Sequence, residues 1–282
     1  MEIIVISHEK CIKCKKCIDE CPADVLEMND SLQIAKPELC VSCGHCAAIC
    51  PQSAIACSDK NQHHQFRIIK ILDDLPIDRK LFHTKRSIRK FLDKPVDNND
   101  LSEIVRYAEM APSSHNLRNR EYLIITDAAD IKQISDKIVN TYKSLLRVLN
   151  PFTLWLISLS NKNAHKELLE MVAAFKHLIE MNKQGQDKIF RNSKCIICIA
   201  APRGSIHSKD DCIASQHYMM LFAHSIGISS FIVGFAQYAH KIIEKHFKLK
   251  GGISIFSVSA LGYAKHSYSN EIIYQSPQIL WR

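Results

Sequence analysis

Residues 11–22 read CIKCKKCIDECP, and residues 40–51 read CVSCGHCAAICP. Both stretches follow one pattern, Cys-x2-Cys-x2-Cys-x3-Cys-Pro, and between them they hold eight of the twelve cysteines of the chain. A 4Fe–4S cluster needs four thiolates, and a loop with three closely spaced cysteines supplies most of one set. The sequence therefore predicts two 4Fe–4S clusters near the start of the chain.

Two other interpretations of these cysteines fit less well. Zinc sites usually take their ligands as two Cys-x2-Cys pairs, and they need neither a third cysteine in each loop nor the Cys-Pro that follows. A disulfide framework is typical of short secreted chains, whereas this chain has 282 residues and begins MEIIVIS, which lacks the features of a secretory leader.

Residues 8–51 resemble the bacterial two-cluster ferredoxins, including the echo of CPADVL at 21–26 in CPQSAI at 50–55. In such ferredoxins the fourth cysteine of each run ligates the cluster of the other run. The resemblance implies that the two runs exchange one ligand each. The first cluster is then expected on Cys11, Cys14, Cys17 and Cys50, and the second on Cys40, Cys43, Cys46 and Cys21.

The rest of the composition is typical of a globular protein, with 46% hydrophobic and 23% charged residues. No apolar run approaches the roughly 18–20 residues of a membrane span. The apolar segment 152–159 is short and is interrupted by Thr153 and Ser158. We expect a soluble protein with no membrane partner, in a reducing, cytoplasmic compartment.

The formal net charge of +8 at pH 7 does not by itself indicate a nucleic-acid partner. Each oxidised cluster with its four thiolates carries about −2, and one bound phosphate adds up to about −2. The Lys and Arg residues are also scattered, without a basic run interleaved with aromatic residues. We expect a dispersed solvated surface and no nucleic acid; a basic docking face for an acidic electron carrier is a second option.

The chain changes character after the cysteine runs, where a polar stretch contains His63 and His64. Adjacent histidines in a polar linker are usually solvated rather than ligands. We therefore expect a two-cluster domain at residues 1–58, a connector at 59–78 and a second domain at 79–282.

The second domain alternates segments of helical and strand character, which indicates an α+β or α/β fold. The helices are expected at 98–110 (with an N-cap in Asn98-Asn99-Asp100), 130–149, 163–182 and 211–226. The strands are expected at 122–126, 195–201, 231–235 and 253–261, besides one at 3–6 in the first domain.

Three separated patches of the second domain suggest one ligand site. They read KRSIRKF at 85–91, APSSHN at 111–116 and SSFIVGF at 229–235, with LGYAK following at 261–265. Arginine, lysine and a hydroxyl in close succession suit a phosphate, because arginine donates bidentately. Taken singly, the first patch is equally well a solvated basic helix start, and the second is an ordinary loop.

In this order the patches resemble the nitroreductase family of flavin enzymes over residues 82–268 or so. The resemblance implies a central antiparallel-rich sheet flanked by helices, and an interwoven homodimer with FMN at the subunit interface. It implies FMN phosphate and ribityl contacts from Lys85, Arg86, Ser87 and Arg89, with Lys265 returning to the phosphate. Pro112, Ser113, Ser114 and Asn116 are expected along the ribityl chain and ring edge, and Val233 and Gly234 are expected to present backbone amides near the ring.

The sequence departs from the family pattern at several positions. Lys85 replaces the first arginine, 118–120 read RNR where Gln-Pro-Trp is usual, Ser229 and Ser230 occupy a Gly-Thr-like turn, and Ala264 replaces a proline. The substrate pocket is therefore expected to differ from that of other members. The remaining cysteines, Cys57, Cys195, Cys198 and Cys212, are expected to be buried structural thiols.

Together the two resemblances imply an FMN-dependent oxidoreductase with a built-in electron path. Electrons from reduced ferredoxin or another donor would pass through both clusters to FMN, whose N5 would reduce a small organic acceptor such as a nitroaromatic, quinone or activated alkene. No protein catalytic residue is assigned. Two alternatives stay open: an electron-transfer or flavin module without its own substrate, and an NAD(P)H-driven reductase. The sequence fixes neither the substrate, nor the direction of the reaction, nor the role of 139–190.

Overall fold

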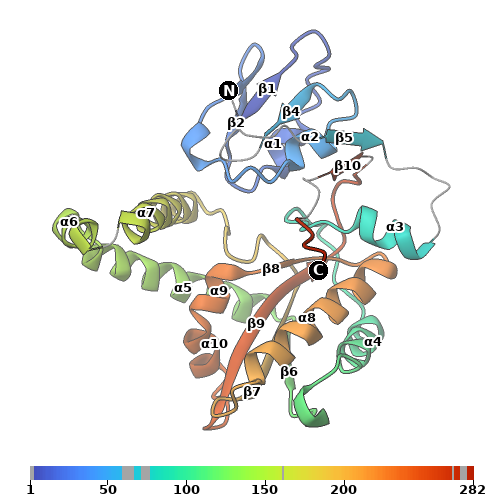
Figure 1. The fold of residues 1–282 in the computed structure, drawn as a ribbon, viewed down its shortest axis with the longest axis vertical. Helices are drawn as coiled ribbons and strands as arrows, with labels where there is room; N and C mark the ends of the chain where they lie inside the picture. The colour runs from blue at the N-terminus through green and yellow to red at the C-terminus, as the bar shows by residue number, and fades with distance from the viewer. Residues whose placement is uncertain (1–2, 59–66, 71–76, 161, 269, 274–277) are drawn as a thin grey trace. The chain divides into compact units, whose positions relative to one another are not determined.

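The computed structural model describes residues 3–58, 67–70, 77–160, 162–268, 270–273 and 278–282. By its internal contacts the chain forms two compact units (Figure 1). The first unit combines Met1–Lys85 with Lys265–Arg282, and the second is Arg86–Ala264.

The predicted domain boundaries stay a prediction. The contacts place Lys265–Arg282 with the N-terminal unit, whereas the sequence predicts these residues at the end of the second domain. His63, His64 and most of the expected connector lie outside the described residues.

The first unit is built from short antiparallel strand pairs and short helices. In chain order these are β1 (Ile4–Ile6), α1 (Lys16–Glu20), β2 (Leu26–Met28), β3 (Leu32–Ile34), η1 (Pro37–Leu39), α2 (His45–Ile49), β4 (Ile55–Cys57), β5 (Arg67–Lys70), α3 (Ile77–Thr84) and β10 (Asn270–Ile273). β1 pairs with β4, β2 with β3, and β5 with β10. Ile4, Leu26, Leu32 and Ile49 form part of its buried core. Isolated two-stranded pairs are marginally stable, so this unit depends on that core and on what its cysteines bind.

The second unit is organised on a four-stranded sheet with the order β6-β7-β9-β8, in which every neighbouring pair is antiparallel. The strands are β6 (Glu121–Ile125), β7 (Cys195–Pro202), β8 (Ser229–Ile232) and β9 (Ile253–Gly262). The helices are α4 (Asn98–Ala108), η2 (Ser114–Asn116), α5 (Ala128–Val148), α6 (Pro151–Ser160), α7 (Lys162–Lys183), α8 (Ser208–Ser225), α9 (Gly234–Tyr238) and α10 (His240–His246).

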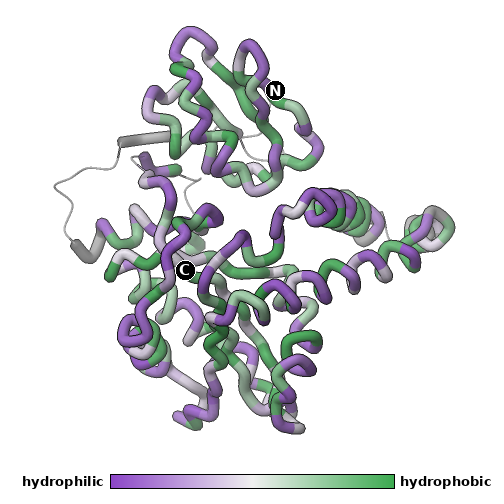
Figure 2. The backbone as a smooth tube through the Cα atoms, turned by 180° about the vertical axis from the view of Figure 1, so that it is seen from behind, coloured by the Kyte–Doolittle hydropathy of each residue, from purple (hydrophilic) through white to green (hydrophobic). Residues whose placement is uncertain are grey.

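Helices cover both faces of this sheet, and β7 shows why its sequence is continuously apolar. Ile196 and Cys198 pack in one core cluster with residues of α5, α7, α9 and α10. Cys195 and Ile197 pack in another cluster with residues of α4 and α8. Because successive side chains of a strand point to opposite faces, a strand covered on both sides needs apolar residues throughout. Figure 2 shows the strands of this unit mostly green, whereas the helices alternate between purple and green.

The predicted elements are found with small shifts at their ends, and Cys195 and Cys198 are buried on opposite faces as expected. Asp97, one residue earlier than predicted, caps α4 by accepting a hydrogen bond from the Asn99 amide. The predicted strand 231–235 is wrong at its end, because Gly234 begins α9. Helix α6 was not predicted, since its apolar sequence gives no amphipathic period.

Gly262 is required for the contact between β9 and Phe91. A Cβ added at Gly262 would lie 2.9 Å from Phe91 Cδ1, and Phe91 itself stacks on Phe231 with 6.1 Å between ring centroids. Because the added methyl group would overlap the Phe91 ring and force it to shift, we expect Gly262→Ala to lower the free energy of unfolding by about 1–3 kcal/mol, measured by chemical denaturation. Gly251→Ala is the control, because a Cβ there meets nothing within 4 Å. Equal stability of the two variants would contradict this packing role.

Candidate functional sites

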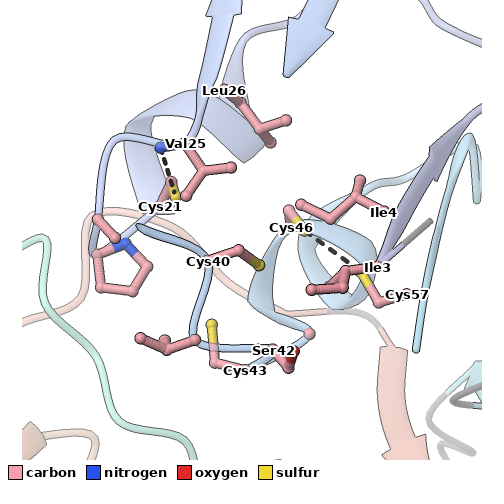
Figure 3. A pocket seen from close by; sticks show the side chains of 14 residues that line it. Ile3, Ile4, Cys21, Val25, Leu26, Cys40, Ser42, Cys43, Cys46 and Cys57 are labelled. Carbon is pink, nitrogen blue, oxygen red and sulfur yellow. Dashed lines mark hydrogen bonds between the residues drawn. The ribbon is translucent and has the colours of Figure 1, made fainter. Parts of the chain in front are cut away.

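Two cavities of the first unit are each lined by four cysteines of the paired runs. The Cys46 cavity, shown in Figure 3, is lined by Cys21, Cys40, Cys43 and Cys46. The Cys17 cavity is lined by Cys11, Cys14, Cys17 and Cys50. The structure thus brings together the same two sets that the sequence predicts as ligands, each with three cysteines from one run and one from the other.

The two runs fold alike because the same backbone turns recur at equivalent positions. The residue before each helix is left-handed, with φ 59° at Lys15 before α1 and φ 68° at Gly44 before α2. Lys13 and Ser42 are left-handed as well, with φ of 54° and 51°. A left-handed residue other than glycine costs roughly 1–2 kcal/mol. Each loop therefore stores strain where its cysteines surround the cavity, which is a common property of binding sites.

Backbone amides donate to the fourth cysteine of each run. The Val25 amide lies 3.3 Å from Cys21 Sγ, and the Ala54 amide lies 3.2 Å from Cys50 Sγ. Each donor follows its cysteine at the same spacing, so the two contacts are equivalent. Hydrogen bonds of this kind stabilise a thiolate and influence the reduction potential of a cluster that the thiolate holds.

The surroundings of the thiols otherwise disfavour negative charge. Burial, followed by the neighbouring Cys46, Cys50 and Cys14, raises the pKa of Cys17 to about 12. Burial also raises the pKa of Cys21. Four thiolates in such a cavity require a compensating positive charge, which bound iron supplies.

Each set of four thiols provides the number of ligands that one 4Fe–4S cluster needs. Among the described residues, no three Cys, His, Asp or Glu side chains converge as ligands of one metal ion. A 4Fe–4S cluster instead takes its four thiolates on four separate irons. The cavities and their donors fit that group.

The C-terminal segment of the first unit contacts both cluster-bearing helices. Lys265 Nζ and His266 Nε2 each lie 2.7 Å from Asp19 Oδ2, and the Tyr268 hydroxyl donates to Glu20 Oε2 at 2.9 Å. The Asn270 amide donates to the Cys50 carbonyl at 3.2 Å. Lys265 thus has a carboxylate partner within its own unit, and its expected role at a flavin phosphate stays a prediction.

In the second unit the structure brings the first and third sequence patches together. Ser87 forms a parallel bridge with Ser230, and the Ile88 amide donates to the Ser230 carbonyl at 3.2 Å. The Arg89 guanidinium lies over the Phe231 ring, 5.6 Å from its centroid. Residues 87–89 therefore lie beside β8, close to the turn into α9.

At that turn the two predicted backbone donors differ. The Val233 amide donates to the Val258 carbonyl at 2.9 Å and is used within the fold. Gly234 is the first residue of α9, a position whose amide has no partner within its helix. A Cβ added at Gly234 would meet nothing within 4 Å, so no protein neighbour explains the glycine.

The second patch forms a tight loop around η2, in which His115, Asn116 and Arg118 have φ between 47° and 54°. The Ser114 amide donates to Asp211 Oδ1 at 3.0 Å, so the start of α8 holds the loop. The Arg118 amide donates to Ser113 Oγ at 3.1 Å. Three left-handed residues so close together mark a backbone shaped for a function rather than for stability alone.

Arg120 holds this loop through hydrogen bonds from its buried side chain. Its side chain is fully buried and donates to the carbonyls of Glu109, Ala111, Pro112 and Asp211 at 3.0–3.4 Å. It also pairs with Glu109 Oε1 at 3.3 Å. Tyr122 donates to the same carboxylate at 2.6 Å, and burial followed by this bond raises the pKa of Tyr122.

Sequence reasoning missed Arg120, Glu109 and Asp211 as positioning residues. The available signal was an arginine directly before an apolar strand, because an arginine that is buried beside such a strand needs polar partners.

Residues 83–263 match the model of the Nitroreductase family. The chain belongs to this family. Residues 10–55 match the model of a 4Fe-4S dicluster domain, which covers both cysteine runs. A provisionally named NADH dehydrogenase/NAD(P)H nitroreductase of Archaeoglobus fulgidus is 23% identical over 192 residues, which cover 66% of this chain and 84% of the relative.

Solved structures of the nitroreductase family share the fold. A nitroreductase with bound FMN from Desulfitobacterium hafniense has a TM-score of 0.54 at 15% identity, covering 74% of this chain and 99% of that one. A second, also with bound FMN, from Bacteroides fragilis, has a TM-score of 0.52 at 14% identity, covering 73% and 95%. At these identities the likeness concerns the fold alone.

These comparisons confirm the predicted nitroreductase-like α+β fold and the predicted two-cluster ferredoxin-type segment. They place the chain in an oxidoreductase family. Within the described part of the chain, no helix is long and apolar enough to cross a membrane. The assignments of individual residues to clusters and to flavin stay predictions.

Replacing one exchanged cysteine should affect both cavities. We expect Cys21→Ala to reduce the iron and sulfide content to half or less, because the run that loses Cys21 also shapes the neighbouring cavity. Cys212→Ala is the control, since Cys212 is buried in the second unit and its loss should leave the iron content unchanged. A Cys21→Ala protein that retains two clusters would refute the exchange of ligands.

Removing the loop anchor should destabilise the second unit. We expect Arg120→Met to lower the free energy of unfolding by about 3 kcal/mol or more, because several buried carbonyls and the Glu109 carboxylate lose their donor. Arg106→Met is the control: that side chain is 62% exposed and contacts Glu103 and the ring of Tyr107 at the surface, so the loss should stay below about 1 kcal/mol. Denaturant unfolding monitored by circular dichroism compares the two, and similar losses would contradict the anchoring role.

Proposed function

We propose that the protein is an FMN-dependent oxidoreductase that receives electrons through two fused 4Fe–4S clusters and reduces a small organic acceptor. The observation that carries the proposal is the presence, in one chain, of two four-cysteine cavities and a nitroreductase-family unit. A nitroaromatic, a quinone or an activated alkene is an acceptor of the appropriate class.

The first unit supplies the cluster sites. Cys11, Cys14, Cys17 and Cys50 hold one cluster in this proposal, and Cys40, Cys43, Cys46 and Cys21 hold the other, which follows from the lining of the two cavities. The equivalent amide donors to Cys21 and Cys50 support it, because both stabilise a thiolate. None of the twelve cysteines is joined in a disulfide, which is consistent with the proposed reducing compartment, such as the cytoplasm.

The second unit supplies the flavin site. Both structural relatives described above carry FMN. Arg86, Ser87 and Arg89 lie half-buried beside β8, where cationic and hydroxyl donors suit the phosphate, with Lys85 and Lys265 as further candidates. The open space at Gly234 and the position of its amide suit a planar ring that accepts a hydrogen bond. Bound FMN exchanges electrons singly or in pairs, which connects one-electron clusters to a two-electron reduction.

The second sequence patch is proposed to contribute to a flavin site as well, through the loop around η2. Pro112, Ser113, Ser114 and Asn116 lie on the loop that α8 and Arg120 hold, whereas the first and third patches meet at β8. We propose a homodimer in which the loop of one subunit completes the flavin site of the other. The strained, anchored backbone of the loop suits that role, since it keeps its shape before a partner arrives.

Two alternative functions can be tested in the same experiment as the proposed one. An NAD(P)H-driven reductase is favoured by the name of the Archaeoglobus fulgidus relative. An electron-transfer or flavin module without its own substrate needs the same cofactors but no acceptor pocket.

The electron donor distinguishes these functions. The reconstituted protein is mixed anaerobically with reduced ferredoxin, NADH or NADPH, and cluster and flavin absorbance are followed separately. We expect ferredoxin to bleach both cofactors and to sustain turnover of an acceptor panel, and Cys21→Ala to lose ferredoxin-driven turnover. Flavin reduction by NAD(P)H that is unaffected by Cys21→Ala would favour the NAD(P)H-driven reductase. Rapid flavin reduction without turnover of any acceptor would favour the electron-transfer module.

A further inference from the structure

A ninth cysteine lies at the Cys46 cavity, outside both cysteine runs. Cys57, the last residue of β4, lines this cavity and is 3% exposed. Its Sγ lies 3.5 Å from Cys46 Sγ, which is within hydrogen-bonding distance for sulfur (Figure 3). The sequence pattern gave Cys57 no function, but the structure places it directly behind a proposed cluster ligand.

The other cavity has no such donor at the equivalent position. Cys57 follows Cys46 at the same spacing at which Met28 follows Cys17, and Met28 lines the Cys17 cavity. A thioether can accept a weak hydrogen bond but has no proton to donate. The two cavities therefore share their backbone but differ in one sulfur group.

Only one direction is available for a hydrogen bond between the two sulfurs when a cluster is bound. Cys46 is then an iron-bound thiolate without a proton, so that Cys57 must be the donor. A hydrogen bond to a coordinating sulfur draws negative charge away from the cluster and favours the reduced state, which carries one more electron. The bond lies in a buried setting, where it acts more strongly than at the surface.

We propose that the Cys57 thiol donates a hydrogen bond to the Cys46 thiolate and raises the reduction potential of the cluster in the Cys46 cavity. This inference rests on the proposed cluster assignment. Cys57 is a tuning residue in it, not a ligand, and no bond to iron forms or breaks. Lys15 and Lys16 line the Cys17 cavity and also act on potential through their charge, so the inference concerns the change in one cluster and not the order of the two.

Potentiometric titration of the reconstituted full-length protein, followed by electron paramagnetic resonance, tests the proposal. Cys57→Ala and Cys57→Val remove the donor, Cys57→Ser retains a donor, and Met28→Leu alters the lining of the other cavity without adding a donor. We expect both non-donating variants to shift the one-electron reduction equilibrium of a single cluster tenfold or more toward the oxidised state, about 59 mV. Cys57→Ser should shift it much less, and Met28→Leu should leave that cluster unchanged.

Three outcomes would overturn the proposal. In the first, the reduction potential of the cluster is unchanged in both non-donating variants. In the second, Cys57→Ser shifts the potential as far as these variants do, which indicates an effect of packing. In the third, both non-donating variants lose the cluster and Cys57→Ser keeps it with an altered resonance signal, which indicates that residue 57 is a ligand of the cluster. Absence of two clusters in the unmodified protein is a different result, because it rejects the proposed function itself.

Discussion

Gathering four thiolates around one small cavity is the constraint on which the first unit depends. Burial disfavours the negative charge of a thiolate, and it is the main reason why the pKa of Cys17 and of Cys21 is raised; at Cys17 the neighbouring thiols add to the effect. Backbone amides that donate to Cys21 Sγ and Cys50 Sγ offset part of this cost. Left-handed residues form the turns that bring the cysteines around each cavity. The short strands and the small core would not hold such turns alone, so bound iron is part of what stabilises this unit.

In the second unit, hydrogen bonds fix the backbone of an irregular loop. Its loop at 112–118 has little secondary structure, yet its backbone is fixed from one side by the Asp211 carboxylate and from another by the buried Arg120. A buried guanidinium is tolerated only when it has several acceptors, and four carbonyls and a carboxylate provide them here. The loop is consequently a rigid surface on a rigid sheet, which is the arrangement that a cofactor site requires.

The sequence predicted the structure well where a residue pattern is typical of one kind of site or one kind of element. The cysteine spacing predicted two clusters, the resemblance to two-cluster ferredoxins implied the two sets of cysteines that line the cavities, and the apolar run at 195–201 predicted the strand that is β7. The sequence was less informative where tertiary contacts determine the structure. Helix α6 has no amphipathic period, and the N-cap of α4 is Asp97 rather than a residue of 98–100. The Val233 amide, expected near the flavin ring, donates to the Val258 carbonyl instead. The contacts of Arg120 and Cys57 were not predicted, because the sequence does not show that Arg120 reaches Asp211 or that the Cys57 thiol lies beside Cys46.

The division of the chain also has a consequence for its biosynthesis. The first unit is interrupted, since Arg86–Ala264 lies between its two parts. Strand β5 can pair with β10 only after the whole second unit has been translated, and the contacts of Tyr268 and Asn270 with α1 and α2 form equally late. The cysteine loops are synthesised before the second unit, and the segment that packs beside them is synthesised after it. Iron delivered between these two steps would therefore meet open loops, and the later segment would close the unit around its clusters.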